Sequence, residues 1–96
     1  MEEKAKEIAG LLKLLANEQR LLILCALMKS PVPLTVGEIH SFTPHITASA
    51  LSQHLNQLRV AGILESEKQG MNVIYRIRDQ RVTALLGAVK ECYCDE

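Results

Sequence analysis

The sequence predicts a mainly α-helical domain that carries a small β-hairpin. Apolar residues recur with the 3.6-residue period of a helix through most of the chain, and after Gly62 the period changes to two. Ahead of Gly62, a short helix, a turn and a longer helix with a polar face are expected to follow one another. A hairpin appended to that order makes a winged helix-turn-helix. With 96 residues, 48% of them hydrophobic, the chain suits one domain over residues 1–96.

The first two helices are expected from Glu2 to Leu15 and from Glu18 to about Lys29. The first is amphipathic, with Ile8, Leu11, Leu12 and Leu15 at helical spacing. Asn17 can cap the second helix, whose run LLILCALM is apolar all round. Because an all-round apolar helix is a buried one, Cys25 is expected inside the core or at its edge.

Two prolines make Ser30 to Leu34 a connection between helices. Thr35 and Glu38 then match a capping box, which opens a short helix that ends near Ser41. Phe42 to His45 is expected to form the turn into the next helix.

The stretch from Ile46 to Gly62 predicts one helix with Thr47 as its N-cap and Gly62 just after its end. Its apolar stripe consists of Leu51, Leu55 and Leu58. Its polar face consists of Ser49, Ser52, Gln53 and Asn56, with His54 and Gln57 beside it. Solvated helix faces are usually rich in Lys and Glu, and this face has neither. Short or planar polar groups donate and accept hydrogen bonds, so we predict a surface that reads base edges.

Two strands are expected after this helix, from Ile63 to Gln69 and from Val73 to Arg78, joined by a turn at residues 70–72. The basic side chains of the hairpin suit phosphate oxygens, and Glu65 and Glu67 partly offset them. These basic residues are Lys68, Arg76 and Arg78.

Asp79 can cap a last helix from Gln80 to about Cys92. Its apolar stripe consists of Val82, Leu85, Leu86, Val89 and Tyr93. Because both terminal helices carry apolar stripes, we expect a second copy to cover part of each in a two-fold dimer. Two reading helices about one helical turn of DNA apart would meet a pseudo-palindromic site in double-stranded DNA.

Composition excludes several classes of protein. Eleven basic and eleven acidic residues give zero formal net charge, which argues against a bulk electrostatic nucleic-acid binder. No apolar run is long enough to span a membrane, and the start MEEKAKE lacks a signal peptide's apolar core, so a cytoplasmic location is expected. Three cysteines, an odd number, favour core thiols, a metal site or a redox site over a disulfide framework.

Three stretches carry a family resemblance: LLKLLANEQRLLILCAL, TVGEI and ITASALSQHLNQLRVAGILESEKQGMNVIYRI. Together they resemble the ArsR/SmtB family of bacterial winged-helix repressors over nearly the whole chain. The resemblance implies a homodimer built on the first and last helices, with the Ile46 to Gly62 helix in the major groove and the Gln69 to Asn72 turn at the wing tip. The DNA-contacting residues are then expected to be Thr47, Ala48, Ser49, Ser52, Gln53 and His54 in the helix, and Lys68, Gln69, Gly70, Asn72 and Arg76 in the wing.

The sensing site is less uniform in that family. Thr35 and Gly37 stand where many members have metal-binding cysteines, so that thiolate site is absent. His40, His45 and His54 are expected to have surface or hydrogen-bonding roles rather than to form a metal cluster.

The segments RLLILCAL and ECYC resemble the dithiol branch of the family, the HlyU- and BigR-like regulators, which senses reactive sulfur species or oxidants. The matching positions are Cys25 and Cys94, with Cys92 as the alternative partner because helical phase turns it inward. The resemblance implies a repressor or anti-repressor whose DNA affinity changes when the pair is oxidised or persulfidated.

Two alternatives stay open. The thiols of Cys25, Cys92 and Cys94 also suit a soft site for arsenite, cadmium or copper(I). A winged-helix module that binds protein is the other alternative. An enzyme is not expected, because no set of nucleophile, base and orienting group is visible and Cys-x-Cys is not the spacing of dithiol oxidoreductases. No cofactor is expected either.

Overall fold

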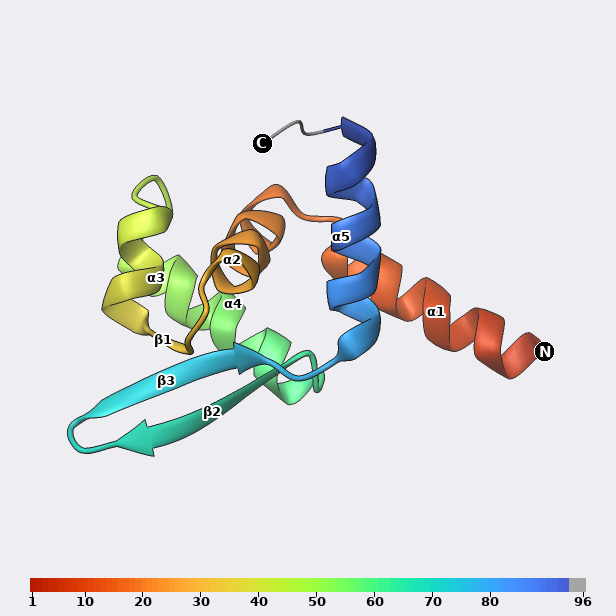
Figure 1. Ribbon diagram of the computed structural model, residues 1–96. Coiled ribbons are helices and arrows are strands. Elements are labelled where there is room, and N and C mark those ends of the chain that lie inside the picture. Colours follow the sequence, from red (N-terminus) through yellow and green to blue (C-terminus); the bar gives the residue numbers. More distant parts are fainter. Residues whose placement is uncertain (94–96) are drawn as a thin grey trace.

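The computed structural model describes residues 1–93 of the chain, and the side chains of residues 1–89. This part forms five helices and three strands (Figure 1). The elements are α1 (Glu2–Leu15), α2 (Glu18–Lys29), β1 (Leu34–Thr35), α3 (Val36–Phe42), α4 (Ala48–Val60), β2 (Leu64–Gln69), β3 (Asn72–Ile77) and α5 (Gln80–Tyr93). None of these helices is long and apolar enough to cross a membrane.

The three strands form one antiparallel sheet in the order β1-β3-β2. Its first strand was not expected from the sequence, since Ser30 to Leu34 was predicted to be only a connection. Leu34 pairs with Tyr75, and Thr35 with Ile74. A strand of two residues is too short to show a period of two, which is why the sequence pattern missed it.

The helix boundaries follow their capping residues. The Asn17 side chain accepts a hydrogen bond from the Arg20 amide at 3.1 Å, and Asp79 Oδ1 accepts one from the Arg81 amide at 3.0 Å. The predicted capping box of α3 is present, because Thr35 Oγ1 and the Glu38 carboxylate each accept from the other residue's amide. These side chains satisfy amides that the first turn of a helix leaves without partners.

Helix α2 is buried on one side only, which corrects the prediction of an all-round buried helix. Ile23, Leu24 and Leu27 lie in the core, whereas Leu22 and Cys25 are exposed. The sheet and helices α3 and α4 cover one face of α2, and the described residues leave the opposite apolar face only partly covered. Cys25 is exposed beside the core residue Leu86, so of its two predicted placements, inside the core or at its edge, the first is wrong.

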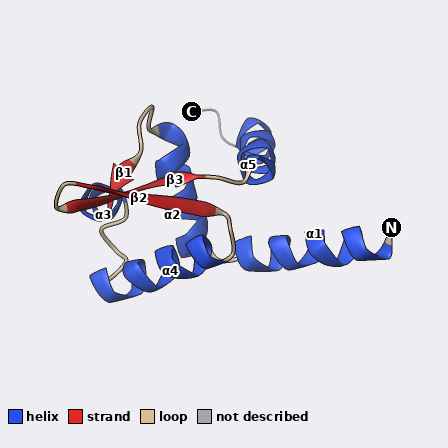
Figure 2. Ribbon diagram, turned by 90° about the horizontal axis from the view of Figure 1, so that it is seen from below, coloured by secondary structure: helices blue, strands red, loops and turns tan. Residues whose placement is uncertain are grey.

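Helix α1 buries little of its apolar surface within one chain, and α5 buries part of its apolar stripe. Helix α1 projects away from the rest of the domain (Figures 1 and 2) and buries only Leu15, while Ile8 and Leu12 are exposed. In α5, Val82 and Leu86 are buried and Val89 is exposed. An ion pair of 3.1 Å between Arg81 and Glu7 connects α5 to α1.

Candidate nucleic-acid interface

Both ends of α4 are fixed by local hydrogen bonds. At the start, Thr47 Oγ1 accepts from the Ala50 amide at 3.1 Å, as an N-cap does. At the end, the Ile63 amide donates to the Leu58 carbonyl and the Gly62 amide to the Arg59 carbonyl, each at 3.0 Å. Gly62 has φ = +83°, so these two bonds form a Schellman motif around a left-handed glycine. Both predicted capping positions of this helix are confirmed.

The burial of α4 separates its two faces. Leu51, Leu55 and Leu58 have no exposed surface and form the centre of the hydrophobic core. The side chains on the opposite face are exposed, and they are Thr47, Ala48, Ser49, Ser52 and Gln53. Because three leucines are embedded in the core, rotation of α4 about its axis would expose apolar surface, and the polar face is therefore held outward.

His54, the sixth residue of this helix that was predicted to contact DNA, is placed differently from the other five. Its side chain is half-buried and points toward the start of α2, where both ring nitrogens have partners. Nδ1 lies 3.2 Å from Arg20 Nε, and Nε2 lies 2.7 Å from Gln19 Oε1. Burial, followed by the positive charge of Arg20, lowers the pKa of His54 below its ordinary value of 6.5.

Arg20 joins three helices at this point, and the sequence analysis did not identify it. Its guanidinium donates to His54, to the Leu14 carbonyl at the end of α1, and to Gln57 Oε1 in α4. Arg20 and His54 lie 34 residues apart, so no local spacing pattern could have revealed the pair. The signal available in the sequence was a cation, Arg20, directly before the apolar run of this helix.

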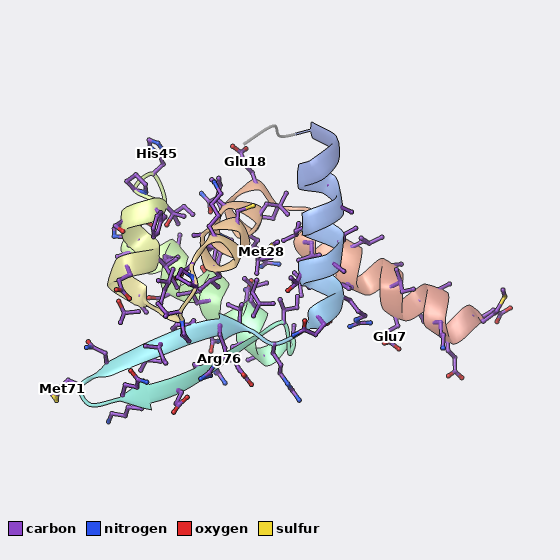
Figure 3. All side chains as sticks on the ribbon, viewed as in Figure 1. Glu7, Glu18, Met28, His45, Met71 and Arg76 are labelled. Carbon is purple, nitrogen blue, oxygen red and sulfur yellow. The ribbon has the colours of Figure 1, made fainter. Side chains whose placement is uncertain are left out.

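The hairpin forms the wing, and its turn is tight. Gly70 and Met71 are the two residues between β2 and β3, and Gly70 has φ = +61°. A positive φ at the first turn residue alone matches a type II′ turn, which glycine adopts without a steric penalty. Met71 lies at the tip of the wing (Figure 3), and its side chain is 97% exposed. Lys68, Gln69 and Asn72 flank this tip and are exposed.

Arg76 carries its charge in a paired state. Its guanidinium lies 2.6 Å from Glu67 and 3.6 Å from Glu65, both on the neighbouring strand. The register explains this contact, because Arg76 pairs directly with Glu65 and Glu67 is two residues further along the same face. Lys68 lies on the other face of the hairpin, and no carboxylate pairs with it in the described part of the chain.

The described side chains include one of the three cysteines. Cys25 is exposed and lines a cavity of about 100 Å³ between α2 and α5, together with Met28, Lys29 and Leu86. Met28 lies on the side of α2 that faces α5 (Figure 3). The side chain of Cys92 and all of Cys94 lie outside the described residues, so the predicted pairing with Cys25 stays a prediction.

The histidines do not gather into a metal site. His40 Nε2 lies 2.8 Å from the Ile46 carbonyl, where it holds the turn between α3 and α4, and His54 contacts α2. Within the part of the chain that the structure describes, no three His, Cys, Asp or Glu residues lie together as a potential metal-binding group. The hydrogen-bonding roles expected for these two histidines are confirmed.

A helix with an exposed polar face, held by a short capped helix and flanked by a β-wing, defines a DNA-binding protein of the winged helix-turn-helix class. The family model described as "Bacterial regulatory protein, arsR family" matches residues 17–66, which run from the cap of α2 into the wing. The chain belongs to this family, the arsR family of bacterial regulatory proteins.

Similar proteins cover nearly the whole chain. The HTH-type transcriptional regulator YgaV of Escherichia coli K12 is 36% identical over 94 residues, which are 98% of this chain and 93% of that protein. The structure of HlyU from Vibrio cholerae, named a transcriptional activator, is 38% identical with a TM-score of 0.88, covering 99% of this chain and 100% of that one. The structure of the transcriptional repressor BigR from Xylella fastidiosa is 32% identical with a TM-score of 0.87, covering 100% of this chain and 95% of that one.

These matches confirm the predicted fold and the predicted class of function. The fold is a winged helix-turn-helix of the ArsR/SmtB type, and the chain is a DNA-binding transcriptional regulator. Since its relatives are regulators, the chain is not placed among enzymes. As an ArsR-family regulator it binds operator DNA, and dimers are typical of the family.

Proposed function

We propose that the chain acts in the cytoplasm as a homodimer that binds a pseudo-palindromic operator, as a repressor or an anti-repressor. Helix α4 enters the major groove and the wing follows the adjacent phosphates. The exposed polar face of α4 supports this assignment, since its side chains are free to face base edges. His54 is left out of the predicted set of DNA contacts because both its ring nitrogens have partners in α2. The proposed contacts are Thr47, Ala48, Ser49, Ser52, Gln53, Lys68, Gln69, Gly70, Asn72 and Arg76.

The dimer is proposed to form through α1 and α5. Ile8 and Leu12 in α1 and Val89 in α5 are exposed apolar residues, and the two helices are joined by the ion pair of Arg81 with Glu7. A second copy that covered these residues would remove apolar surface from water. It would also set the separation of the two α4 helices, which has to match one turn of DNA.

We further propose that oxidation or persulfidation of Cys25 together with Cys94, or alternatively Cys92, lowers the affinity for DNA. The single observation that carries this proposal is the exposure of Cys25 at a cavity whose opposite wall is Leu86 of α5. The other two cysteines follow six and eight residues after Leu86 in the sequence.

The chemistry balances with an organic persulfide as the oxidant. The Cys25 thiolate attacks the outer sulfur of the persulfide, RSSH, and releases the thiol RSH. The second cysteine then attacks the inner sulfur of the new Cys25 persulfide, and H₂S leaves as the disulfide forms. The protein loses two hydrogens, and the persulfide is reduced to RSH and H₂S.

A bridge between α2 and the end of α5 would be transmitted to the reading helix through α2. That helix carries both Cys25 and Arg20, and Arg20 donates hydrogen bonds to His54 and Gln57 of α4. A shift of α2 that broke these bonds would change the placement of α4 in each protomer. Two reading helices out of register with the groove would bind the operator less tightly.

The test combines intact-protein mass spectrometry with DNA titration on fragments of the gene's own upstream region, before and after exposure to an organic persulfide. The expected result is a loss of two hydrogens, or a gain of whole sulfur atoms in a bridge from Cys25, together with weaker DNA binding. Cys92→Ser and Cys94→Ser are matched variants, and only the variant that lacks the true partner should fail to form the bridge.

Three results would contradict the thiol switch. A Cys25→Ser variant that loses DNA affinity as strongly as the unmodified chain would show that this thiol is not the sensor. Release of DNA by arsenite, cadmium or copper(I), without any bridge, would favour the soft three-thiol site. Failure to bind any upstream fragment at low salt, together with tight binding to a protein, would favour a protein-interaction module.

A further inference from the structure

The contact between His54 and Arg20 defines the protonation state of the histidine. An arginine Nε carries a hydrogen and has no acceptor lone pair, so His54 Nδ1 at 3.2 Å has to accept. The ring proton is therefore on Nε2, which donates to Gln19 Oε1 at 2.7 Å. This geometry requires a neutral imidazole with one donor and one acceptor, both used within the protein.

The same arginine fixes α4 to the other two helices of the N-terminal half. Besides His54, Arg20 donates to Gln57, which is three residues further along α4, and at 3.1 Å to the Leu14 carbonyl at the end of α1. Residues three apart share one side of a helix, so the guanidinium contacts α4 at two adjacent points. The buried leucines of α4 fix its distance from the core. The hydrogen bonds of Arg20 fix its position relative to the first turn of α2.

We propose that His54 and Arg20 are positioning residues for DNA binding: their hydrogen bond holds α4 in the orientation that presents its polar face, and protonation of His54 releases it. A protonated imidazole carries hydrogens on both nitrogens. Its Nδ1–H would then face the Nε–H of Arg20, with two donors and two positive charges opposed. The inference rests on α4 as the reading helix of the proposed function.

The charges around the ring determine the sign of the pH dependence. Arg20 is the charged group that faces His54 from α2, while α4 contributes the uncharged Gln57 amide and α1 the Leu14 carbonyl. Burial and Arg20 both hold the pKa of His54 below 6.5. The hydrogen bond is therefore intact above pH 6.5 and is lost as the pH falls through the lowered pKa, so acidification should weaken DNA binding.

A direct contact between His54 and a phosphate predicts the opposite sign. A histidine that binds phosphate gains affinity when it is protonated, because the new positive charge neutralises the backbone. The slope of DNA affinity against pH therefore distinguishes a positioning residue from a contacting one. A residue needed only for folding would change the fraction of folded protein and leave the affinity of the folded protein independent of pH.

The experiment measures operator affinity from pH 5.5 to 7.5 at constant ionic strength for the reduced full chain and for His54→Asn. Asparagine keeps an acceptor near the position of Nδ1 and does not titrate. We expect the unmodified chain to bind more weakly at pH 5.5 than at pH 7.5 relative to the variant, by up to about tenfold, because one proton on a group whose pKa lies below 6.5 changes affinity by no more than this over that range. His45→Asn is the matched control, because His45 is exposed in the turn before α4 (Figure 3), and it should keep the full pH dependence.

The outcomes separate this inference from the function on which it rests. Equal pH profiles for the unmodified chain and His54→Asn would overturn the inference alone, as would an affinity that rises on acidification only when His54 is present. Absence of DNA binding at every pH would overturn the proposed function as well. Circular dichroism checks that each variant is folded. Long-range ¹H–¹⁵N spectra of the free chain at pH 7.5 give an independent test, and a proton on Nδ1 instead of Nε2 would contradict the geometry.

Discussion

Helix α4 buries three leucines completely, whereas α1 buries only Leu15 and leaves Ile8 and Leu12 exposed. Helix α4 is capped at both ends and is attached to α2 by Arg20, and α1 is attached to α5 by the ion pair between Glu7 and Arg81. The position of the reading helix is therefore determined within one chain, because core packing and hydrogen bonds both fix it. In the proposed dimer, the position of one α4 relative to the other would depend on apolar surfaces of α1 and α5 that the described part of one chain leaves uncovered.

The largest effect is expected from a cavity under α4. Leu55→Ala should lower the free energy of unfolding by about 3 kcal/mol, since replacing a fully buried leucine by alanine costs about 2–5 kcal/mol. Urea denaturation followed by circular dichroism measures this change. Leu12→Ala, on an exposed position of α1, is the matched substitution and should cost less at protein concentrations where the chain is monomeric. Equal losses of stability for the two variants would contradict the conclusion that core packing fixes α4 more strongly than α1.

A charge introduced on α1 tests whether the exposed apolar surface of this helix forms the proposed dimer interface. Leu12 is 46% exposed in the single chain, and we expect Leu12→Glu to raise the dimer dissociation constant about tenfold or more, because a carboxylate would be buried without a partner. Sedimentation velocity over a range of concentrations measures the dissociation constant. Val32→Glu places the same charge on an exposed residue of the proline-containing connection and should leave the dimer intact. A dimer that tolerates Leu12→Glu would place the interface elsewhere.

Substitution of the N-cap of α5 should lower the stability by a smaller amount, and this loss should depend on pH. Asp79→Ala removes an N-cap and should cost about 1 kcal/mol of stability near neutral pH. Hydrogen bonds from Arg81 hold the pKa of Asp79 below its ordinary value of 3.8, so this contribution is present above that value and is lost as the pH falls through the lowered pKa. Thermal melts between pH 3 and pH 7 measure it. Asp79→Asn keeps an acceptor for the cap and should lose less, whereas equal losses would assign the effect to charge.

The smallest effect is expected in the wing. Glu67→Gln removes a carboxylate 2.6 Å from Arg76 and should raise DNA affinity about two- to fivefold at low salt, in keeping with the ~0.2–1 kcal/mol of an exposed ion pair. Fluorescence anisotropy with labelled operator DNA measures the change. Glu3→Gln alters the net charge equally from the first turn of α1 and is the control. If both variants gain equally, the effect comes from net charge and not from release of Arg76.

Patterns within a few residues of one another predicted the local structure well. The bounds of α1 and α2, the capping box at Thr35 and the left-handed Gly62 are confirmed, because caps and periods act over three or four residues. The order of short helix, turn, longer helix and hairpin predicted the winged helix-turn-helix, and the comparisons confirm this fold.

Contacts between distant segments could not be predicted from these patterns. The exposure of Cys25 depends on which face of α2 the rest of the chain covers, and the apolar run gave no indication of it. The partners of His54 come from α2, 34 and 35 residues away. The pairing of Arg76 with Glu65 depends on the register of the hairpin, which a one-residue change in its turn would alter.

Because the wing has a two-residue turn at Gly70 and Met71, the number of residues in each strand determines which charged side chains share a face. Successive strand residues face opposite sides and the turn sets the register, so one residue inserted between Glu65 and Lys68 would leave Lys68 opposite Val73 and move Glu65 to the side away from Arg76. An insertion of two residues would restore the original sides and only lengthen the arm. Among relatives of this chain, wings should therefore differ in length by even numbers of residues per strand.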